Sequence, residues 1–320
     1  MSRNYSIFSF LIIVISIFID RSFSPDYFAY IAYLKHDSII LEPTFRIIKH
    51  IVNVVGNENI LFGIYAVFGV GIKLYSFPKL TNILFFTILL YLCSYWIYQD
   101  LIQIRAGVAS AIFLLSLPYL INRDLKKYFI TIFIAILFHY SAIILIPVWF
   151  IGGKLNLRYV YIAIIPLAMV MYLVKLDLIR LLSLIPIEYI QGKIETYSIV
   201  SNSLSSRGVL VASEYNPFLT WYLLKAFIVE LLWFNINSIR KHNRYAVVLL
   251  KIFTISISIL WLFSGAPVIA TRISEFLSIV QIILVPLLVY SHMPRFISHT
   301  IICMYSFCWL FWNYSSFLKF

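Results

Sequence analysis

Charged residues, glycine and cysteine are scarce in this chain. Only 12% of its 320 residues are charged, and it holds 10 glycines and three cysteines. A soluble domain carries about 25% charged residues, so this chain lacks the polar surface of a soluble protein. The cysteines, Cys93, Cys303 and Cys308, sit in apolar runs without metal-ligand spacing or a disulfide pattern, and we read them as small hydrophobic residues.

The motifs of several enzyme classes are also missing. The chain has no glycine-rich phosphate loop, no HExxH, no CxxC pair and no nucleophile elbow. It also has no DxD-type carboxylate pair to hold a metal ion and a nucleotide sugar. These absences argue against an enzyme that uses soluble nucleotide donors on the cytoplasmic side. We expect neither a metal nor a cofactor.

Hydrophobic sequence dominates what is present. Hydrophobic residues make up 62% of the chain, and the mean hydropathy is +0.94. A bilayer crossing needs about 17–25 apolar residues, and runs near that length fall at 5–19, 60–75, 81–98, 105–121, 128–150, 159–175, 217–236, 246–264, 273–290 and 299–317. We therefore predict an all-α fold, a polytopic transmembrane helix bundle of about 10–11 spans in which residues 1–320 form a single integral membrane domain.

The net charge of +12 fits membrane topology better than nucleic-acid binding, because basic loops mark the cytoplasmic side of a membrane protein. The most basic short connections are 122–127 and 239–244, and we place both in the cytoplasm. Counting spans from them places residues 20–59 and 191–216 outside, as two external (periplasmic) loops. Within the first loop, apolar residues between 45 and 55 follow helical spacing, which predicts a helix in the plane of the membrane interface.

The cytoplasmic placement of these two basic connections, which we call the basic anchors, conflicts with a simple count of the spans between them. A single crossing by 128–150 and another by 159–175 would leave the second loop inside. Either residues 176–190 form an extra short or re-entrant membrane segment, or the run 128–150 is broken in the middle. We favour the extra segment, because its first half reads as a short amphipathic helix that Pro186 would end.

The stretch from Gln99 to Ala111 places Arg105 at the mouth of an apolar run and follows it with small residues. Small residues let neighbouring membrane helices approach closely. Arg105 is either a snorkelling arginine at a helix end or an anion clamp, because a guanidinium binds phosphate oxygens bidentately. The same span count places the entrance to the Arg105 helix, residues 99–104, on the outer face of the membrane. Further charged residues fall on or near this outer face, namely Asp26, Glu42, Arg46, Arg207, Arg272 and Glu275.

Outer-facing arginines suit a diphosphate at the membrane surface, such as that of a polyprenyl-linked sugar. The carboxylates are candidates for proton transfer, but they could equally neutralise the arginines in salt bridges. His139 lies in the middle of a predicted span. A histidine there is either hydrogen-bonded within the bundle or functional.

These residues resemble those of the Wzy-type polysaccharide polymerases, most closely the EpsG-like branch. The matching segments follow the family's order and cover roughly residues 20–290: Asp26-Tyr27 with Tyr30, Glu42-Pro43-Thr44-Phe45-Arg46, Ile104 to Ala109, Phe138 to Ala142 with Ile146-Pro147, and Lys193 to Tyr197. One departure is Ala106, where the family often has glutamine after the arginine.

The resemblance implies a metal-independent glycosyltransferase with a GT-C-like architecture in the bacterial inner membrane. It would join undecaprenyl-diphosphate-linked oligosaccharide repeat units at the outer face, for an O-antigen, a capsule or an exopolysaccharide. Its partners would be that oligosaccharide, membrane lipid and a chain-length regulator, with no nucleic acid. The reaction needs a base for the attacking sugar hydroxyl and positive charge for the departing diphosphate. We assign the base to His139 first and Asp26 second, and substrate binding to Arg105, Arg272, Arg46, Arg207, Glu42 and Tyr197.

Two other classes also explain membrane arginines at the outer face. A flippase or transporter of lipid-linked oligosaccharide needs them too, although the sequence has no pair of corresponding interrupted helices in two halves. An O-antigen ligase differs from a polymerase only in its acceptor. Only the family resemblance disfavours the ligase.

Overall fold

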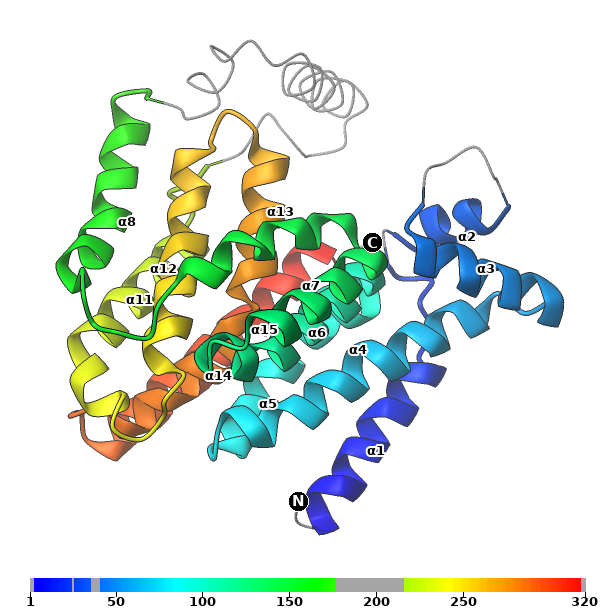
Figure 1. The fold of residues 1–320 in the computed structure, drawn as a ribbon, viewed down its shortest axis with the longest axis horizontal. Coiled ribbons are helices and arrows are strands. Elements are labelled where there is room, and N and C mark those ends of the chain that lie inside the picture. The colour runs from blue at the N-terminus through cyan, green and yellow to red at the C-terminus, as the bar shows by residue number, and fades with distance from the viewer. Residues whose placement is uncertain (1–2, 25, 36–40, 177–215, 318–320) are drawn as a thin grey trace. The chain divides into compact units, whose positions relative to one another are not determined.

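The computed structural model describes residues 3–24, 26–35, 41–176 and 216–317. These residues form helices and no strand, which confirms the all-α class. Most elements are α-helices, η1 is a π-helix, and the other η elements are 3-10 helices (Figure 1). In chain order they are α1 (Arg3–Phe18), α2 (Tyr27–Lys35), α3 (Pro43–Val55), α4 (Asn59–Leu80), α5 (Leu84–Cys93), η1 (Trp96–Ile102), α6 (Ile104–Ile121), α7 (Leu125–Phe138), η2 (Tyr140–Leu145), η3 (Pro147–Phe150), α8 (Arg158–Leu173), α11 (Thr220–Ile239), α12 (Ala246–Leu262), α13 (Pro267–Leu277), η4 (Ser278–Val280), α14 (Gln281–Leu284), η5 (Val285–Tyr290) and α15 (Arg295–Phe317).

Each apolar run of the sequence coincides with a helix or with a broken pair of helices. Four of these are long and apolar enough to cross a membrane: α4, α6, α11 and the continuous stretch Pro267–Tyr290. A fifth crossing is present if α5 and η1, which meet at a bend of 57°, count as one span. The chain is thus a multi-pass membrane protein, and helix length and composition support four or five of the expected spans.

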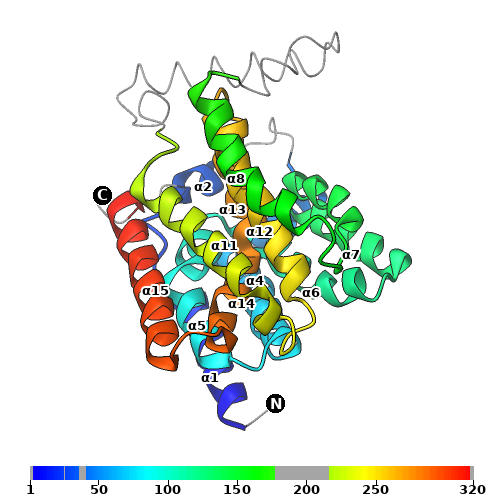
Figure 2. The ribbon, with the colours of Figure 1, turned by 90° about the vertical axis from the view of Figure 1, so that its left-hand side faces the viewer.

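The helices fall into two compact units. The first comprises residues 1–153, 238–246 and 282–320, and the second comprises 154–237 and 247–281. In the first unit, α4 packs against α1 and α6, α6 packs against α7, and α15 packs against α5 (Figures 1 and 2). The single membrane domain expected from the sequence stays a prediction.

The second unit is held by long basic side chains that bind backbone carbonyls. Arg158 donates to the Trp233 carbonyl at 3.0 Å, and Lys251 donates to the Lys154 carbonyl at 2.8 Å. Lys225 and Glu275 form an ion pair in which the lysine side chain is fully buried. An intramembrane charge of this kind is stable only with a partner, which the carboxylate supplies.

The run 128–150 is not one helix but two antiparallel halves joined at His139. The His139 backbone is extended (φ −155°, ψ 115°) and ends α7. The returning half lies beside α7, because Tyr128 donates to the Leu145 carbonyl at 2.7 Å and Arg123 donates to the Ile151 carbonyl at 2.8 Å. Pro147 lacks the N–H that an α-helix through this half would need. The expectation that His139 lies mid-helix is therefore wrong.

This hairpin removes the conflict between the two basic anchors. The 14 residues of α7 extend about 21 Å, and the 3-10 turns of 140–150 return over about 22 Å. Residue 151 thus comes back to the side of loop 122–127. Counted from that side, a single crossing by the run 159–175 agrees with the predicted external placement of the second loop. The break in 128–150, which the sequence ranked second, is what the structure shows. The favoured segment, 176–190, lies almost wholly outside the described residues.

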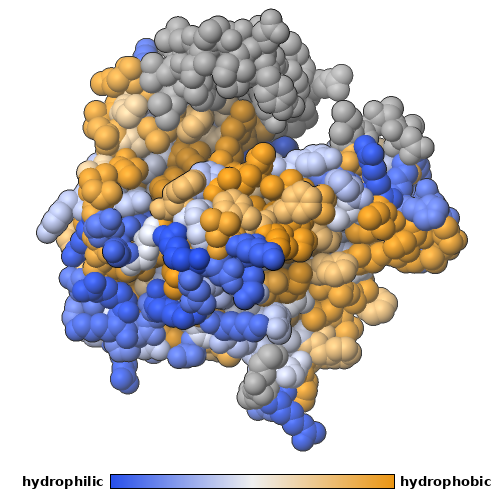
Figure 3. All heavy atoms as spheres, in the orientation of Figure 1, coloured by the Kyte–Doolittle hydropathy of each residue, from blue (hydrophilic) through white to orange (hydrophobic). Residues whose placement is uncertain are grey.

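Helix α3 confirms the helical spacing found in the first external loop. Phe45, Ile48 and Val52 are buried on one face. Other apolar residues of α3 are exposed, and a hydrophobic surface covers the right-hand part of Figure 3, where α1, α3 and α4 lie. The exposed members on α3 are Ile47, Ile51, Val54 and Val55. Its placement in the membrane interface stays a prediction.

We expect cysteine labelling in intact cells to place the two ends of the first unit on opposite sides of the membrane. After replacement of the native cysteines, a membrane-impermeant maleimide should modify Asn53→Cys and miss Lys241→Cys; both positions are exposed. The basic loop should share its side with the end of α4, because Asn243 donates to the Leu80 carbonyl at 2.7 Å. Labelling of Lys241→Cys but not Asn53→Cys would reverse the topology.

Candidate functional site

Three of the predicted site residues meet in the first unit around a buried carboxylate. Glu42 precedes α3, Arg105 lies in the first turn of α6, and His139 separates α7 from η2. Glu42 Oε2 lies 2.7 Å from Arg105 Nη1, and Glu42 Oε1 lies 3.2 Å from His139 Nδ1. Only 4% of the Glu42 side chain is exposed, against 20% for Arg105 and 25% for His139. We call these three residues the Glu42 cluster.

Local hydrogen bonds hold the cluster together. Pro43 starts α3 with a fixed backbone angle and without an N–H to satisfy, which suits the first helical position. Thr44 Oγ1 donates to the Leu137 carbonyl at 2.7 Å, and the Tyr140 hydroxyl donates to the Leu41 carbonyl at 3.3 Å. These bonds tie the first turn of α3 and the residue before Glu42 to the two sides of the His139 break.

Aromatic rings surround the guanidinium of Arg105. Its central carbon lies 5.5 Å from the ring centroid of Tyr30, 5.3 Å from that of Tyr33 and 5.8 Å from that of Phe45. Such rings attract a cation through their negative faces. Arg105 is therefore enclosed and paired with Glu42, so the salt bridge that the sequence left open is present. The bond with Glu42 uses one Nη group of the planar fork.

The charge of Glu42 fixes the hydrogen on the His139 ring. Burial works to raise the pKa of Glu42, but the hydrogen bond with His139 and the charge of Arg105 outweigh it and lower that pKa to about 2. An ionised carboxylate only accepts hydrogen bonds. Nδ1 of His139 must then carry the hydrogen, and Nε2 becomes the nitrogen that can accept a proton.

Of the other predicted residues, the structure describes Asp26, Arg46 and Arg272. Asp26 comes one turn before Tyr30, whose ring lies beside Arg105, and its backbone carbonyl accepts the Tyr30 N–H at 3.0 Å. Arg46 is exposed on α3. Arg272 is exposed on α13 in the second unit. Arg207 and Tyr197 lie outside the described residues.

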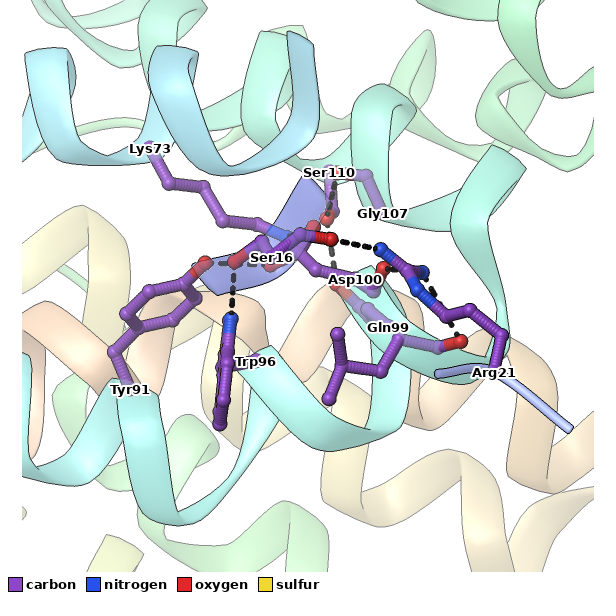
Figure 4. Close-up of polar contacts among 10 residues, drawn as sticks. Ser16, Arg21, Lys73, Tyr91, Trp96, Gln99, Asp100, Gly107 and Ser110 are labelled. Atoms are coloured by element: carbon purple, nitrogen blue, oxygen red, sulfur yellow. Dashed lines mark hydrogen bonds and ion pairs between the residues drawn. The ribbon is translucent and has the colours of Figure 1, made fainter. Parts of the chain in front are cut away.

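Sequence reasoning missed a second polar group, buried between α4 and η1 in the first unit (Figure 4). Asp100 Oδ1 lies 2.7 Å from Lys73 Nζ, and its Oδ2 accepts the Tyr91 hydroxyl at 2.7 Å. Arg21 donates to the Asp100 backbone carbonyl at 2.7 Å and to the Ser16 carbonyl at 2.6 Å. We call Arg21, Lys73, Tyr91 and Asp100 the Asp100 cluster. The available signal was an ionisable residue, Lys73, within a span-length apolar run.

Two glycines make room for this cluster. A Cβ atom at Gly107 would lie 2.7 Å from the Gln99 carbonyl oxygen and 2.8 Å from Asp100 Oδ1. A Cβ atom at Gly69 would lie 2.7 Å from the same carboxylate oxygen. The close approach expected of the small residues after Arg105 is therefore present, and it accommodates the π-helical turn that carries Asp100.

The Glu42 cluster combines an oriented imidazole with a guanidinium. Among the residues that the structure describes, no three His, Cys, Asp or Glu side chains gather as they would around a metal ion. What the cluster offers is proton transfer at His139 and positive charge at Arg105. Both residues stand at the ends of α7 and α6 opposite loop 122–127, which is the predicted outer side.

Of the comparisons with known proteins, the one with family models agrees with the sequence resemblance. No curated protein and no solved structure matches this chain at a significant level. The model of the EpsG family matches residues 5–320, which is almost the whole chain. The chain belongs to the EpsG family.

Proposed function

We propose that the chain is a polysaccharide polymerase that joins undecaprenyl-diphosphate-linked repeat units at the outer face of the bacterial inner membrane. Membership of the EpsG family supports a membrane protein of polysaccharide biosynthesis. The observation that carries the finer proposal is the Glu42 cluster, where a carboxylate orients an imidazole beside a guanidinium. In this proposal the shorter apolar helices also enter the bilayer, and the fold is a GT-C-like bundle.

The proposed reaction is a glycosyl transfer between two lipid-linked units. A sugar hydroxyl of one unit attacks the anomeric carbon of the other chain while His139 Nε2 takes the hydroxyl proton. The bond between that carbon and the diphosphate oxygen breaks, and its electron pair leaves with the polyprenyl diphosphate. A positioned base of this kind contributes about 10²–10⁴-fold to a rate.

Positive charge near the leaving diphosphate stabilises the negative charge that it gains. Arg105 supplies this charge from a partly exposed side chain, while its bond to Glu42 keeps it in place. Arg46, one turn further along the chain from Glu42, provides a second contact from the surface of α3. The sequence also assigns Arg272 to the diphosphate, Arg207 to a secondary contact and Tyr197 to substrate binding, and these assignments stay predictions.

The test is turnover of purified protein in proteoliposomes that contain undecaprenyl-diphosphate-linked repeat units. A polymerase yields lipid-linked chains of two or more repeats. A flippase moves the units across the bilayer without changing their length, and a ligase transfers them only when its own acceptor is supplied. A control variant, Lys241→Ala, alters an exposed residue of the basic loop and should polymerise like the wild type. Lipid-linked single repeats that cross the bilayer without any change in length would contradict the proposal that the chain is a polymerase.

A further inference from the structure

Tyr140 follows His139 in the chain and begins η2. Its hydroxyl donates to the Leu41 carbonyl at 3.3 Å, while His139 Nδ1 lies 3.2 Å from Glu42 Oε1. Two consecutive side chains, those of residues 139 and 140, thus bind two consecutive residues, 41 and 42. The Tyr140 ring therefore lies beside the Glu42 cluster.

Tyr140 differs in exposure from the aromatic residues that surround Arg105. Tyr30 and Phe45 are 4% and 0% exposed, and Tyr33 is partly buried. Tyr140, in contrast, is 45% exposed. The protein encloses the rings around Arg105, whereas the Tyr140 ring is open to a ligand.

The hydrogen bond to Leu41 decides which part of Tyr140 is left for such a contact. A tyrosine that anchors a protein at the membrane interface sits there with its apolar ring and its polar hydroxyl at the level of the headgroups. Here the hydroxyl donates to the protein backbone instead. The bond fixes the direction of the side chain, and the ring is the part that remains to bind a ligand.

The proposed reaction brings a sugar to this place. The acceptor hydroxyl must come within about 2.6–3.2 Å of His139 Nε2 to give up its proton. The sugar ring that carries this hydroxyl then rests against exposed side chains next to His139, and Tyr140 is the adjacent residue. The C–H groups on the apolar face of a sugar carry a slight positive charge, which suits the negative face of an aromatic ring.

We propose that the ring of Tyr140 binds the acceptor sugar by stacking against its C–H face, an inference that rests on the proposed function. The ring holds the sugar while His139 Nε2 takes the proton from its hydroxyl. Tyr140 forms and breaks no bond, so it sets the affinity for the acceptor. It also favours sugars in which several C–H bonds point to one face.

The experiment measures binding of the repeat-unit oligosaccharide, released from its lipid by mild acid, to the full chain in nanodiscs by saturation-transfer NMR. Tyr140→Gln keeps a donor for the Leu41 carbonyl but lacks the ring. Tyr140→Phe keeps the ring but lacks the donor. Tyr140→Gln should weaken binding about tenfold, as expected for the loss of an aromatic contact and its buried area. Tyr140→Phe should bind nearly as the wild type does.

Two further variants keep the result specific. Phe133→Leu is the matched control, because it removes an exposed ring of α7 away from the cluster, and it should leave binding unchanged. Tyr140→Leu removes the ring a second time with an apolar residue, in case the glutamine variant does not fold. Thermal unfolding of each variant shows which of them are folded.

The outcomes separate this inference from the proposed function. Wild-type binding in the folded variants without the ring, together with normal polymerisation, would overturn the role of Tyr140 and leave the polymerase standing. Equal losses in Tyr140→Phe and Tyr140→Gln would also overturn stacking, because the bond to Leu41 would then be the cause. A wild-type chain that does not bind the oligosaccharide would overturn it as well. Ring-dependent binding in a chain that does not polymerise would support Tyr140 and contradict the polymerase alone.

Discussion

Replacing His139 by glutamine should lower polymerisation per folded molecule by about 10²–10⁴-fold. Glutamine can still donate a hydrogen bond to Glu42, as the imidazole does over 3.2 Å, so folding should be kept. It cannot take the proton from the attacking hydroxyl. Turnover on lipid-linked repeats, normalised to folded protein, measures the effect.

The control for this prediction is Asp26→Asn, which removes the second candidate base one turn before Tyr30. If His139 is the base, this variant should keep most of its turnover. Near-normal turnover in His139→Gln together with a large loss in Asp26→Asn would assign the base to the aspartate. His139 would then serve only to connect α7, η2 and Glu42.

Replacing Asp100 by asparagine should reduce the free energy of unfolding by about 3–5 kcal/mol. The change keeps the size of a side chain walled in by Gly69 and Gly107. It leaves the Lys73 ammonium, which is 0% exposed, without a counter-charge. Burying an unpaired charge is among the most destabilising changes in a protein. The measurement is the midpoint of thermal unfolding in detergent, together with the yield of folded protein.

A double variant separates charge from packing. Lys73→Met in the Asp100→Asn background removes the unpaired ammonium and fills its space with an apolar chain of similar length. It should recover most of the lost stability, because replacing a buried ion pair by neutral groups is often close to neutral. Stability losses that simply add in the double variant would show that the two residues are not coupled.

The helices were largely predictable from the sequence because an apolar run in a membrane protein must satisfy its backbone internally, which favours a helix. The run 128–150 is the exception, since hydropathy alone does not distinguish one long helix from two antiparallel halves. Arg123 and Tyr128 bind the returning chain, and neither contact leaves a local pattern. The basic loops did carry the information that one crossing was miscounted.

The Glu42 cluster was predictable in its members but not in its pairing. Counting spans placed Glu42 and Arg105 at one face, yet only the tertiary structure shows that one carboxylate serves both Arg105 and His139. The Asp100 cluster was missed because Lys73 lies in the run 60–75, whereas Asp100 follows the run 81–98. Nothing in either run indicates that a π-helical turn brings them within 2.7 Å.

The buried pair of Lys73 and Asp100 has a consequence for biogenesis. Asp100 follows Lys73 by 27 residues in the chain, so α4 reaches the insertion machinery before its counter-charge does. A lysine at the centre of a span costs about 2.5–3.5 kcal/mol on insertion. The apolar remainder of α4 must offset that cost until α5 and η1 follow. The stretch from Asn59 to Ile102 therefore enters the bilayer most favourably as one cotranslational unit, with the ion pair formed as its last step.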